Sequence, residues 1–157
     1  MDAEARNKIR EQLAGHRLMT VATLRPDGWP QATTVGYAED GLTLYFLCSA
    51  DSQKAGNIAH DNRISLTIDS DTTDPMAIAG LSMAARAIPV TDPEEIGRMV
   101  ELLIRKYPEY RQLPSPDMSG VAVMRVEPEV ISILDYSKGF GHADLVTVTD
   151  EDLKAAA

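Results

Sequence analysis

The sequence contains a single cysteine, few aromatic residues and no long hydrophobic run. Cys48 is the only cysteine among 157 residues, so no disulfide can form within the chain, which favours a reducing compartment. Aromatic residues make up 5% of the chain, so a core must be built mostly from aliphatic side chains and methionine. The longest apolar stretch, near residues 76–83, is far shorter than the roughly 20 residues that a membrane helix needs. We therefore expect a cytoplasmic protein that does not enter a membrane.

Positive charge is also scarce. The 24 Asp and Glu residues outnumber the 15 Lys and Arg residues and give a formal net charge of -9. Because an acidic protein repels a phosphate backbone, we expect no nucleic-acid partner. An anionic ligand would need a local cationic site, which directs attention to any lysine beside hydroxyl groups and a helix start. Residues 1–16 are charged and lack an apolar centre, so they do not resemble a secretory signal.

The length and hydrophobic content indicate one folded domain. With 157 residues, of which 44% are hydrophobic, the chain can form a substantial core. Domains usually contain roughly 100–200 residues. We expect residues 1–157 to form a single domain with a frayed tail over 149–157.

Segments rich in β-forming residues are separated by turn signals. Residues 17–24, 29–38 and 42–48 are predicted to be strands, with an Asp-Gly turn in each gap. Connections this short predict an antiparallel meander and disfavour parallel βαβ units. Further strands are predicted over 63–68, 76–90, 120–126 and 130–135, the last two interrupted at 127–129, with a short one over 145–148.

Capping residues and helical spacing predict three helices, over residues 2–15, 52–61 and 91–107. Six or so strands with helices at fixed breaks indicate a mainly β fold, an antiparallel barrel with helical attachments.

The segment after the third strand has the features of a phosphate site. Ser49, Ser52 and Lys54 lie where a strand ends and a helix begins. Free backbone N–H groups and the positive end of the helix dipole favour a phosphate at such a place. The hydroxyl groups can donate hydrogen bonds, and the lysine supplies charge. A serine-capped surface helix with a solvated lysine explains the same residues, so the pattern alone does not decide between them.

The strand over residues 29–38 has features of a wall beside a flat ligand. Thr33 and Thr34 place a hydroxyl group on each face, and Gly36 leaves room close to the backbone. Threonine is also a good strand former, which explains these residues without any ligand.

Several short motifs follow one another in a characteristic order within residues 13–135. They are Ala22-Thr23, Asp27-Gly28-Trp29-Pro30, Asp40-Gly41, Ser52-Gln53-Lys54, Asn57 and Asn62-Arg63-Ile64. No single motif is specific. Their order and spacing together resemble the pyridoxamine 5′-phosphate oxidase-like family of FMN-binding split barrels.

The resemblance implies a six-stranded antiparallel split barrel that forms a homodimer with two FMN sites at the subunit interface. Ser52 and Lys54 would hold the phosphate, with Gln53 between them. In the family, the C-terminal segment of one subunit reaches the flavin of the other, which places Tyr136 or Phe140 near the ring. The remaining residues implied to border the isoalloxazine are Ala32, Thr33, Thr34, Val35, Cys48 and Ser49.

Departures from the family pattern narrow the expected activity. Many relatives have arginine where this chain has Gln53, and the true oxidases begin the flavin-facing strand with arginine where this chain has Gln31. Their C-terminal Arg and His arrangement has no counterpart here. We therefore expect an FMN-dependent oxidoreductase other than pyridoxamine phosphate oxidase, for a substrate that the sequence does not identify. No catalytic residue can be named.

Three alternatives remain open. The chain could be a flavin-binding or stress-related protein without turnover, or a split barrel that binds the deazaflavin F420, or one that binds haem. Its histidines, His16, His60 and His142, are widely separated, so we expect no metal site.

Overall fold

The computed structural model describes residues 1–112, 114 and 118–154. The strands are β1 (Leu18–Leu24), β2 (Pro30–Gly36), β3 (Ala38–Asp40), β4 (Thr43–Ser49), β5 (Arg63–Asp69), β6 (Ala79–Pro89), β7 (Val121–Asp135) and β8 (Ala143–Thr147). The α-helices are α1 (Ala3–Gly15), α2 (Gln53–His60), α3 (Pro93–Lys106) and α4 (Asp150–Lys154). Short 3-10 helices are η1 (Pro75–Ala77), η2 (Pro108–Gln112) and η3 (Tyr136–Lys138). No helix in this part of the chain is long and apolar enough to cross a membrane.

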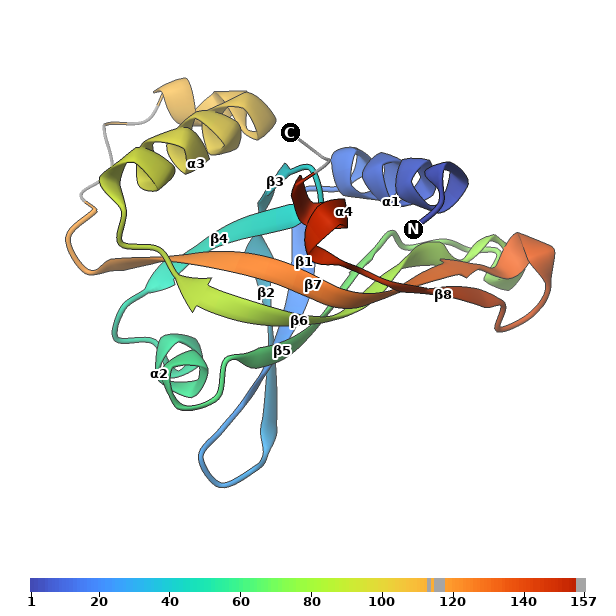
Figure 1. Ribbon diagram of the computed structural model, residues 1–157, viewed down its shortest axis with the longest axis horizontal. Coiled ribbons are helices and arrows are strands. Elements are labelled where there is room, and N and C mark those ends of the chain that lie inside the picture. The colour runs from blue at the N-terminus through green and yellow to red at the C-terminus, as the bar shows by residue number, and fades with distance from the viewer. Residues whose placement is uncertain (113, 115–117, 155–157) are drawn as a thin grey trace.

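The strands form one antiparallel sheet in the order β2-β1-β5-β6-β7-β4-β3, with β8 paired to β7. The two ends of this order, β2 and β3, are consecutive in the chain, so the sheet curls until its edges meet (Figure 1). The prediction of a mainly β, antiparallel split barrel is confirmed. Eight strands are present where the family resemblance implied six. A bend at Tyr37 separates β3 from β2, and the short strand predicted over 145–148 is present as β8, which pairs with β7.

Two predictions about strand pairing need correction. β1 and β2 form the predicted antiparallel hairpin, but the meander does not continue along the whole second strand, because only the short β3 pairs with β4, whose long partner is β7. The interruption expected at 127–129 is also absent, and β7 runs on as one strand. Ala84 pairs with Val130 and Ala85 with Pro128, so Glu129 is the extra residue of a β-bulge. A bulge tolerates a proline, which has no N–H group for the ladder.

The core lies inside the curl of the sheet, and α1 covers it. Ile9 and Leu13, four residues apart on one face of α1, are fully buried against the inner faces of the strands. The amphipathic α3 packs on the opposite side of β4 and forms a second, smaller cluster, in which Met99 and Leu103 contact Tyr45 and Val123. Figure 1 shows these helices above the sheet, whereas α2 lies at its lower end.

Tyr107, which follows α3, holds the point where the two sheet edges meet. Its hydroxyl group accepts a hydrogen bond from the Tyr37 backbone N–H at 3.0 Å and donates one to the Arg17 carbonyl oxygen. A Cβ atom on Gly36 would lie 2.9 Å from this hydroxyl oxygen, so the residue before the bend has to be small. The Arg17 guanidinium lies 4.3 Å from the centre of the Tyr107 ring, which adds a cation–π contact.

The end of the chain differs from the frayed tail expected over 149–157. Residues 150–154 form α4, and the buried carboxylate of Asp152 accepts hydrogen bonds from the Met1 amine at 3.1 Å and from Arg6 at 2.6 Å. The Thr149 hydroxyl donates to the same carboxylate at 2.9 Å. Residues 155–157 lie outside the described residues. Arg6 is 146 positions from Asp152 in the sequence, so no local sequence pattern predicts this contact.

Replacing Tyr107 with Phe should lower the free energy of unfolding by about 1–3 kcal/mol, because the Tyr37 N–H and the Arg17 carbonyl each lose a hydrogen bond and keep only the one between them, at 3.2 Å. Urea unfolding measures this loss. Tyr110→Phe is the matched control, since its ring stacks on Tyr107 at 5.4 Å and is 46% exposed. Equal losses in the two variants would contradict the role given to the Tyr107 hydroxyl.

Asp152 should make the fold sensitive to acid. Hydrogen bonds from Thr149 and from the N-terminal amine lower the pKa of Asp152 from 3.8 to about 2. A pKa below its unfolded value means that the ionised group stabilises the fold at neutral pH, and this stabilisation is lost as pH falls from about 4 toward 2.

Asp152→Asn should therefore melt at a lower temperature than the wild type at neutral pH, with the difference shrinking toward pH 2. Thermal melts across this range provide the measurement. Asp150→Asn, at an exposed position of the same helix, should melt like the wild type. A difference between Asp152→Asn and wild type that does not vary with pH would argue against the ionic contact.

Candidate functional site

The candidate site lies at the end of the barrel where α2 meets β2. Ser52 caps α2, and its Oγ accepts a hydrogen bond from the Ala55 backbone N–H at 3.2 Å. The backbone N–H groups of Gln53 and Lys54 belong to the first turn and have no acceptor within the helix. The predicted helix start is thus confirmed, and it presents free donors next to the end of β4.

A buried polar network joins α2 to the first two strands. The Asn57 side-chain amide donates to Thr23 Oγ1 at 3.0 Å and to Gln31 Oε1 at 3.2 Å. Gln31 Nε2 in turn donates to Gln53 Oε1 at 2.8 Å. The network holds the amide of Gln53 by its oxygen and leaves its NH₂ group available. It also brings the predicted residues of β2 and α2 side by side, although 22 positions separate Gln31 from Gln53.

Thr33 carries a buried hydroxyl group that has no partner. Its Oγ1 atom is shielded from solvent and forms no hydrogen bond within the described residues. Thr33 lies directly opposite Val21, a fully buried residue, so it faces the interior together with Val35. A buried polar atom without a partner is costly and is unusual in folded proteins. The Thr33 hydroxyl is therefore a polar group that the described part of the fold leaves unsatisfied.

Two of the other predicted residues of β2 lie on the opposite face of the strand from Thr33. Ala32 and Thr34 lie on the opposite, exposed face of the strand, because neighbouring residues of a strand alternate between faces. A ligand against one face of β2 can contact the side chains of Thr33 and Val35 or those of Ala32 and Thr34, but not both pairs.

The last residues of β4 lead directly into the helix start. Cys48 is half-buried and packs against the core, whereas Ser49 is exposed. The Ser49 hydroxyl accepts a long hydrogen bond of 3.4 Å from the Asp51 backbone N–H. Lys54 is half-buried and forms no ion pair with any residue of the described chain. Cys48, Ser49, Ser52, Gln53 and Lys54 thus come together at one end of the barrel, as expected.

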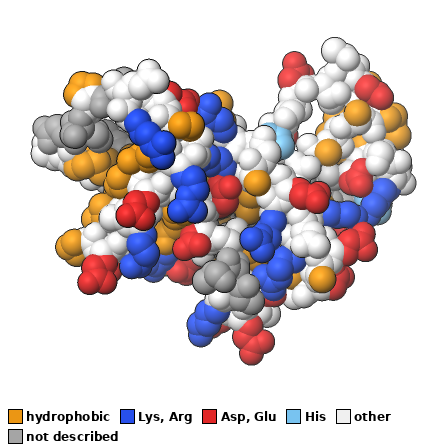
Figure 2. Space-filling model, turned by 90° about the horizontal axis from the view of Figure 1, so that it is seen from above, with side chains coloured by type: hydrophobic (Ala, Val, Ile, Leu, Met, Phe, Trp, Pro, Cys, Tyr) orange, Lys and Arg blue, Asp and Glu red, His pale blue; other side chains and the backbone are white. Residues whose placement is uncertain are grey.

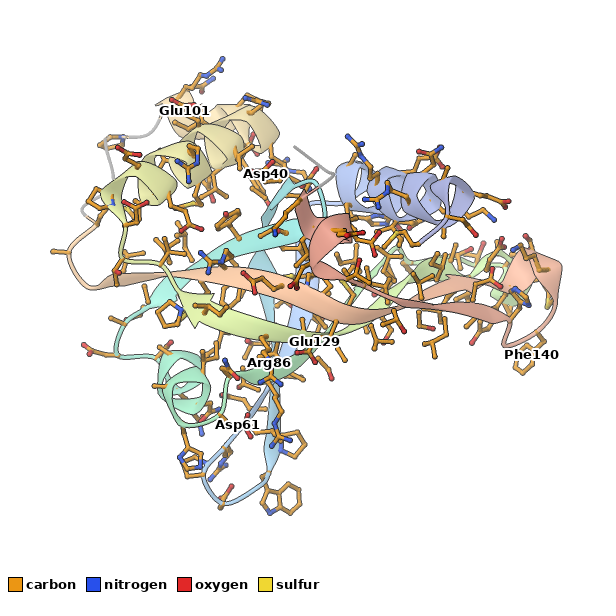
Figure 3. The ribbon with its side chains drawn as sticks, in the orientation of Figure 1. Asp40, Asp61, Arg86, Glu101, Glu129 and Phe140 are labelled. Carbon is orange, nitrogen blue, oxygen red and sulfur yellow. The ribbon has the colours of Figure 1, made fainter. Side chains whose placement is uncertain are left out.

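Tyr136 and Phe140 lie elsewhere. They belong to the arm, the end of the sheet made by residues 69–80 and 134–143, which projects to the right in Figure 1. Their rings meet edge to face at 5.6 Å, and Phe140 is 82% exposed at the tip labelled in Figure 3. Since α2 lies at the other end of the sheet, these residues can border the α2 site only if a second copy supplies them.

Sequence reasoning missed the roles of Thr23 and Asn57. Both are only 2% exposed, and together they fix the position of Gln31. Each belongs to a motif that carried the family resemblance, which was the available signal. Their contact joins β1 to α2 across 34 positions and could not be inferred from spacing.

Comparison with known proteins gives a family match. The family model described as "Pyridoxamine 5′-phosphate oxidase" matches residues 5–135. No curated protein matches the sequence.

Several solved structures share the fold. A haem-binding protein from Mycobacterium smegmatis is 24% identical with a TM-score of 0.79, over 99% of this chain and 62% of that protein. This chain thus spans less than two thirds of that relative. A conserved hypothetical protein from Mycobacterium tuberculosis is 26% identical with a TM-score of 0.71, over 96% of this chain and 95% of that one. The haem storage protein HutZ from Vibrio cholerae is 18% identical with a TM-score of 0.66, covering 78% and 89% of the two chains.

Replacing Thr33 with Val should stabilise the ligand-free protein by about 1 kcal/mol, because it removes an unpaired buried hydroxyl and keeps the shape of the side chain. Urea unfolding of the ligand-free protein measures this change. Thr34→Val, on the exposed face of the same strand, is the control and should change stability little. A clear loss of stability in Thr33→Val would mean that the hydroxyl has a partner in solution.

Proposed function

The chain belongs to the pyridoxamine 5′-phosphate oxidase family, and from this premise we propose that it binds FMN at the start of α2 and works as a flavin-dependent oxidoreductase. The observation that carries the proposal is Lys54, a cation without an ion pair among residues 1–112, 114 and 118–154, which lies beside a capping serine and free backbone N–H groups. In a chain of net charge -9, an unpaired lysine at such a position is a strong attraction for a phosphate.

The phosphate group would be held by charge and hydrogen bonds together. Lys54 supplies the charge, and the backbone N–H groups of Gln53 and Lys54 supply donors aligned with the helix. The Ser52 hydroxyl can donate outward while its oxygen still accepts from Ala55. The side-chain NH₂ of Gln53 is free to donate as well, since Gln31 binds only its oxygen.

The isoalloxazine ring would lie along β2. This strand is at the edge of the sheet and pairs only with β1, so its other side has backbone N–H and C=O groups without strand partners. Such groups can bind the polar edge of a flavin, and the Thr33 hydroxyl adds a buried partner. Bound FMN supplies hydride or electron transfer, while the protein positions the ring and shields it from water. Cys48 and Ser49 would border the same space.

We also propose that the protein is a homodimer. Phe140, exposed over 82% of its surface at the tip of the arm, is a residue that a partner would cover. Tyr136 and Phe140 of a second copy would then approach the flavin, as the family resemblance implies. Gln53 stands where many relatives have arginine, and Gln31 stands where the true oxidases do, so we propose a substrate other than pyridoxamine phosphate. A cytoplasmic location stays a prediction.

Haem is the second candidate ligand. One structural relative is a haem-binding protein, and haem iron takes histidine as an axial ligand. His16 and His142 are engaged with Ser70 and Asp144, whereas His60, exposed at the end of α2, has no hydrogen bond within the described residues. His60 would be the ligand. The absorption spectrum of the purified protein separates yellow flavin from haem with its intense Soret band.

Turnover distinguishes an enzyme from a flavin-binding protein. Steady-state oxidation of a reduced nicotinamide by the FMN-loaded protein would support the oxidoreductase. Tight FMN binding without oxidation of any supplied donor would favour a carrier or stress-related role. An absorption spectrum typical of a deazaflavin would instead favour F420.

Replacing Lys54 with Ala should weaken FMN binding by about 1.5–3 kcal/mol, roughly tenfold to a hundredfold in Kd, because one charge-assisted contact is lost. Riboflavin lacks the phosphate, so its affinity should stay nearly constant. Fluorescence titration with both ligands gives the comparison.

Lys154→Ala removes an exposed lysine on α4 and is the matched control. It should bind both flavins like the wild type. Equal weakening of FMN and riboflavin in Lys54→Ala, or unchanged FMN affinity, would contradict the phosphate site.

A further inference from the structure

A serine and a histidine from distant parts of the chain meet where the end of α1 lies beside the end of β5. His16 follows α1, and Ser70 follows the last residue of β5. The distance from His16 Nε2 to Ser70 Oγ is 2.7 Å, although 54 positions separate the two residues in the sequence. Ser70 is exposed and His16 is half-buried, so a small molecule can reach the serine hydroxyl.

The second ring nitrogen of His16 fixes the direction of this hydrogen bond. His16 Nδ1 lies 2.7 Å from the backbone carbonyl oxygen of Gln12, in the last turn of α1. A carbonyl oxygen can only accept a hydrogen bond, so Nδ1 carries the proton of the neutral ring. Nε2 is then the acceptor, and the Ser70 hydroxyl donates to it. The serine hydroxyl therefore has a base already placed on its proton.

This arrangement has the parts of an activated nucleophile. Such a site needs a nucleophile within hydrogen-bond reach of a base, and a third group that orients the base. Ser70, His16 and the Gln12 carbonyl fill these three positions, and the carbonyl stands where a Ser-His-Asp triad has its carboxylate. The negative end of the α1 dipole lies at the same point and stabilises the positive charge that the ring gains when it accepts a proton.

The loop after Ser70 offers a donor for the negative charge that develops on a substrate. The backbone N–H of Asp71 has no acceptor among residues 1–112, 114 and 118–154. In α/β-hydrolases, the N–H group of the residue that follows the nucleophilic serine donates to the oxyanion. Asp71 occupies that position in this chain, so its N–H group is free for the same use.

The surroundings of Ser70 indicate which esters would fit. Residues 69–80 contain no lysine or arginine but three exposed aspartates, Asp69, Asp71 and Asp74. Figure 2 shows Asp and Glu side chains over the right-hand part of the molecule, where the arm lies. These carboxylates repel an anionic ester. The same loop exposes Met76 and Ile78, by 44% and 37%, which can contact a short acyl chain.

We propose that Ser70 and His16 hydrolyse uncharged carboxylic esters with short acyl chains, at a second site that needs no flavin. The Ser70 oxygen forms a bond to the ester carbonyl carbon while its proton passes to His16 Nε2. The carbon–oxygen bond to the alcohol then breaks, and His16 returns the proton to the leaving oxygen. Water next attacks the acyl-serine and gives a proton to His16. The serine oxygen takes this proton as it leaves, and the acid is released.

This site is separate from the proposed flavin site. Residues 61–62 join α2 to the first residue of β5, whereas Ser70 follows its last residue. The seven-residue strand between them spans about 20 Å. Loss of flavin binding in Lys54→Ala would therefore leave ester hydrolysis intact, and loss of the Ser70 hydroxyl would leave flavin binding intact.

Hydrolysis of p-nitrophenyl butyrate by the purified full chain tests the activity. The wild type should act faster than the same protein unfolded in urea. Ser70→Ala and His16→Gln should each lower the rate by roughly a hundredfold or to that of the unfolded protein, because base-assisted attack is lost. Ser65→Ala, at an exposed serine of β5, and His142→Gln are the matched controls and should keep the wild-type rate. A wild type no faster than the unfolded chain, or an unchanged rate in Ser70→Ala, would overturn the proposal.

Covalent labelling separates catalysis from a hydrogen bond that only joins α1 to β5. A fluorophosphonate loses fluoride to a serine whose proton is taken by a base, and mass spectrometry of the digested protein should find the label on Ser70. His16→Gln should lose the label while thermal melts show that it is folded. Ser70→Ala removes one exposed oxygen atom and decides the question if His16→Gln does not fold. A label on another residue alone, or equal labelling of folded His16→Gln, would contradict the assigned roles.

Discussion

The bend at Tyr37 is the feature on which the rest of the molecule depends. Here the chain leaves one edge of the sheet and enters the other, so that β2 stays an edge strand while β3 leads into β4. The start of α2 follows the end of β4 and lies beside β2. A hydrogen bond between Gln31 and Gln53 joins the helix to this strand. Tyr107 fixes the bend through a hydroxyl that bonds Tyr37 and Arg17, in the space that Gly36 leaves open. Without this bend, the helix start and the edge strand would not meet.

The proposed site departs from the rules that stabilise the rest of the fold. Among the residues that the structure describes, Thr33 buries a hydroxyl without a partner, and Lys54 forms no ion pair in a chain rich in carboxylates. Several cations elsewhere are paired, as Arg6 is with Asp152 and Arg125 with Glu95. Local departures of this kind are expected where a protein binds a ligand, because the ligand supplies the missing partners.

The two faces of β2 can serve different purposes, one a ligand site and the other a contact between copies. Thr33 points inward, toward the core, whereas Ala32 and Thr34 belong to the exposed outer face. Alternation along a strand makes this division unavoidable. One strand can thus contribute to a ligand site and to a contact between copies, and a change on one face need not disturb the other.

The sequence by itself determined the elements whose signals are local. The caps Asp2, Ser52 and Asp92 and the apolar stripes of α1 and α3 lie within a few residues of the structures they specify. The order of short motifs was enough to indicate the split barrel and the cluster at the start of α2.

Only the tertiary structure decided the features that depend on distant partners. These are the pairing of β4 with β7, the passage of β7 through Pro128, the burial of Asp152, the position of Tyr107 and the separation of Phe140 from α2. Tyr107 lies 70 positions from Tyr37, and Asp152 lies 151 positions from Met1. Local propensity acts over a few residues, whereas these contacts form only when the whole sheet has closed, which is why the sequence pattern did not reveal them.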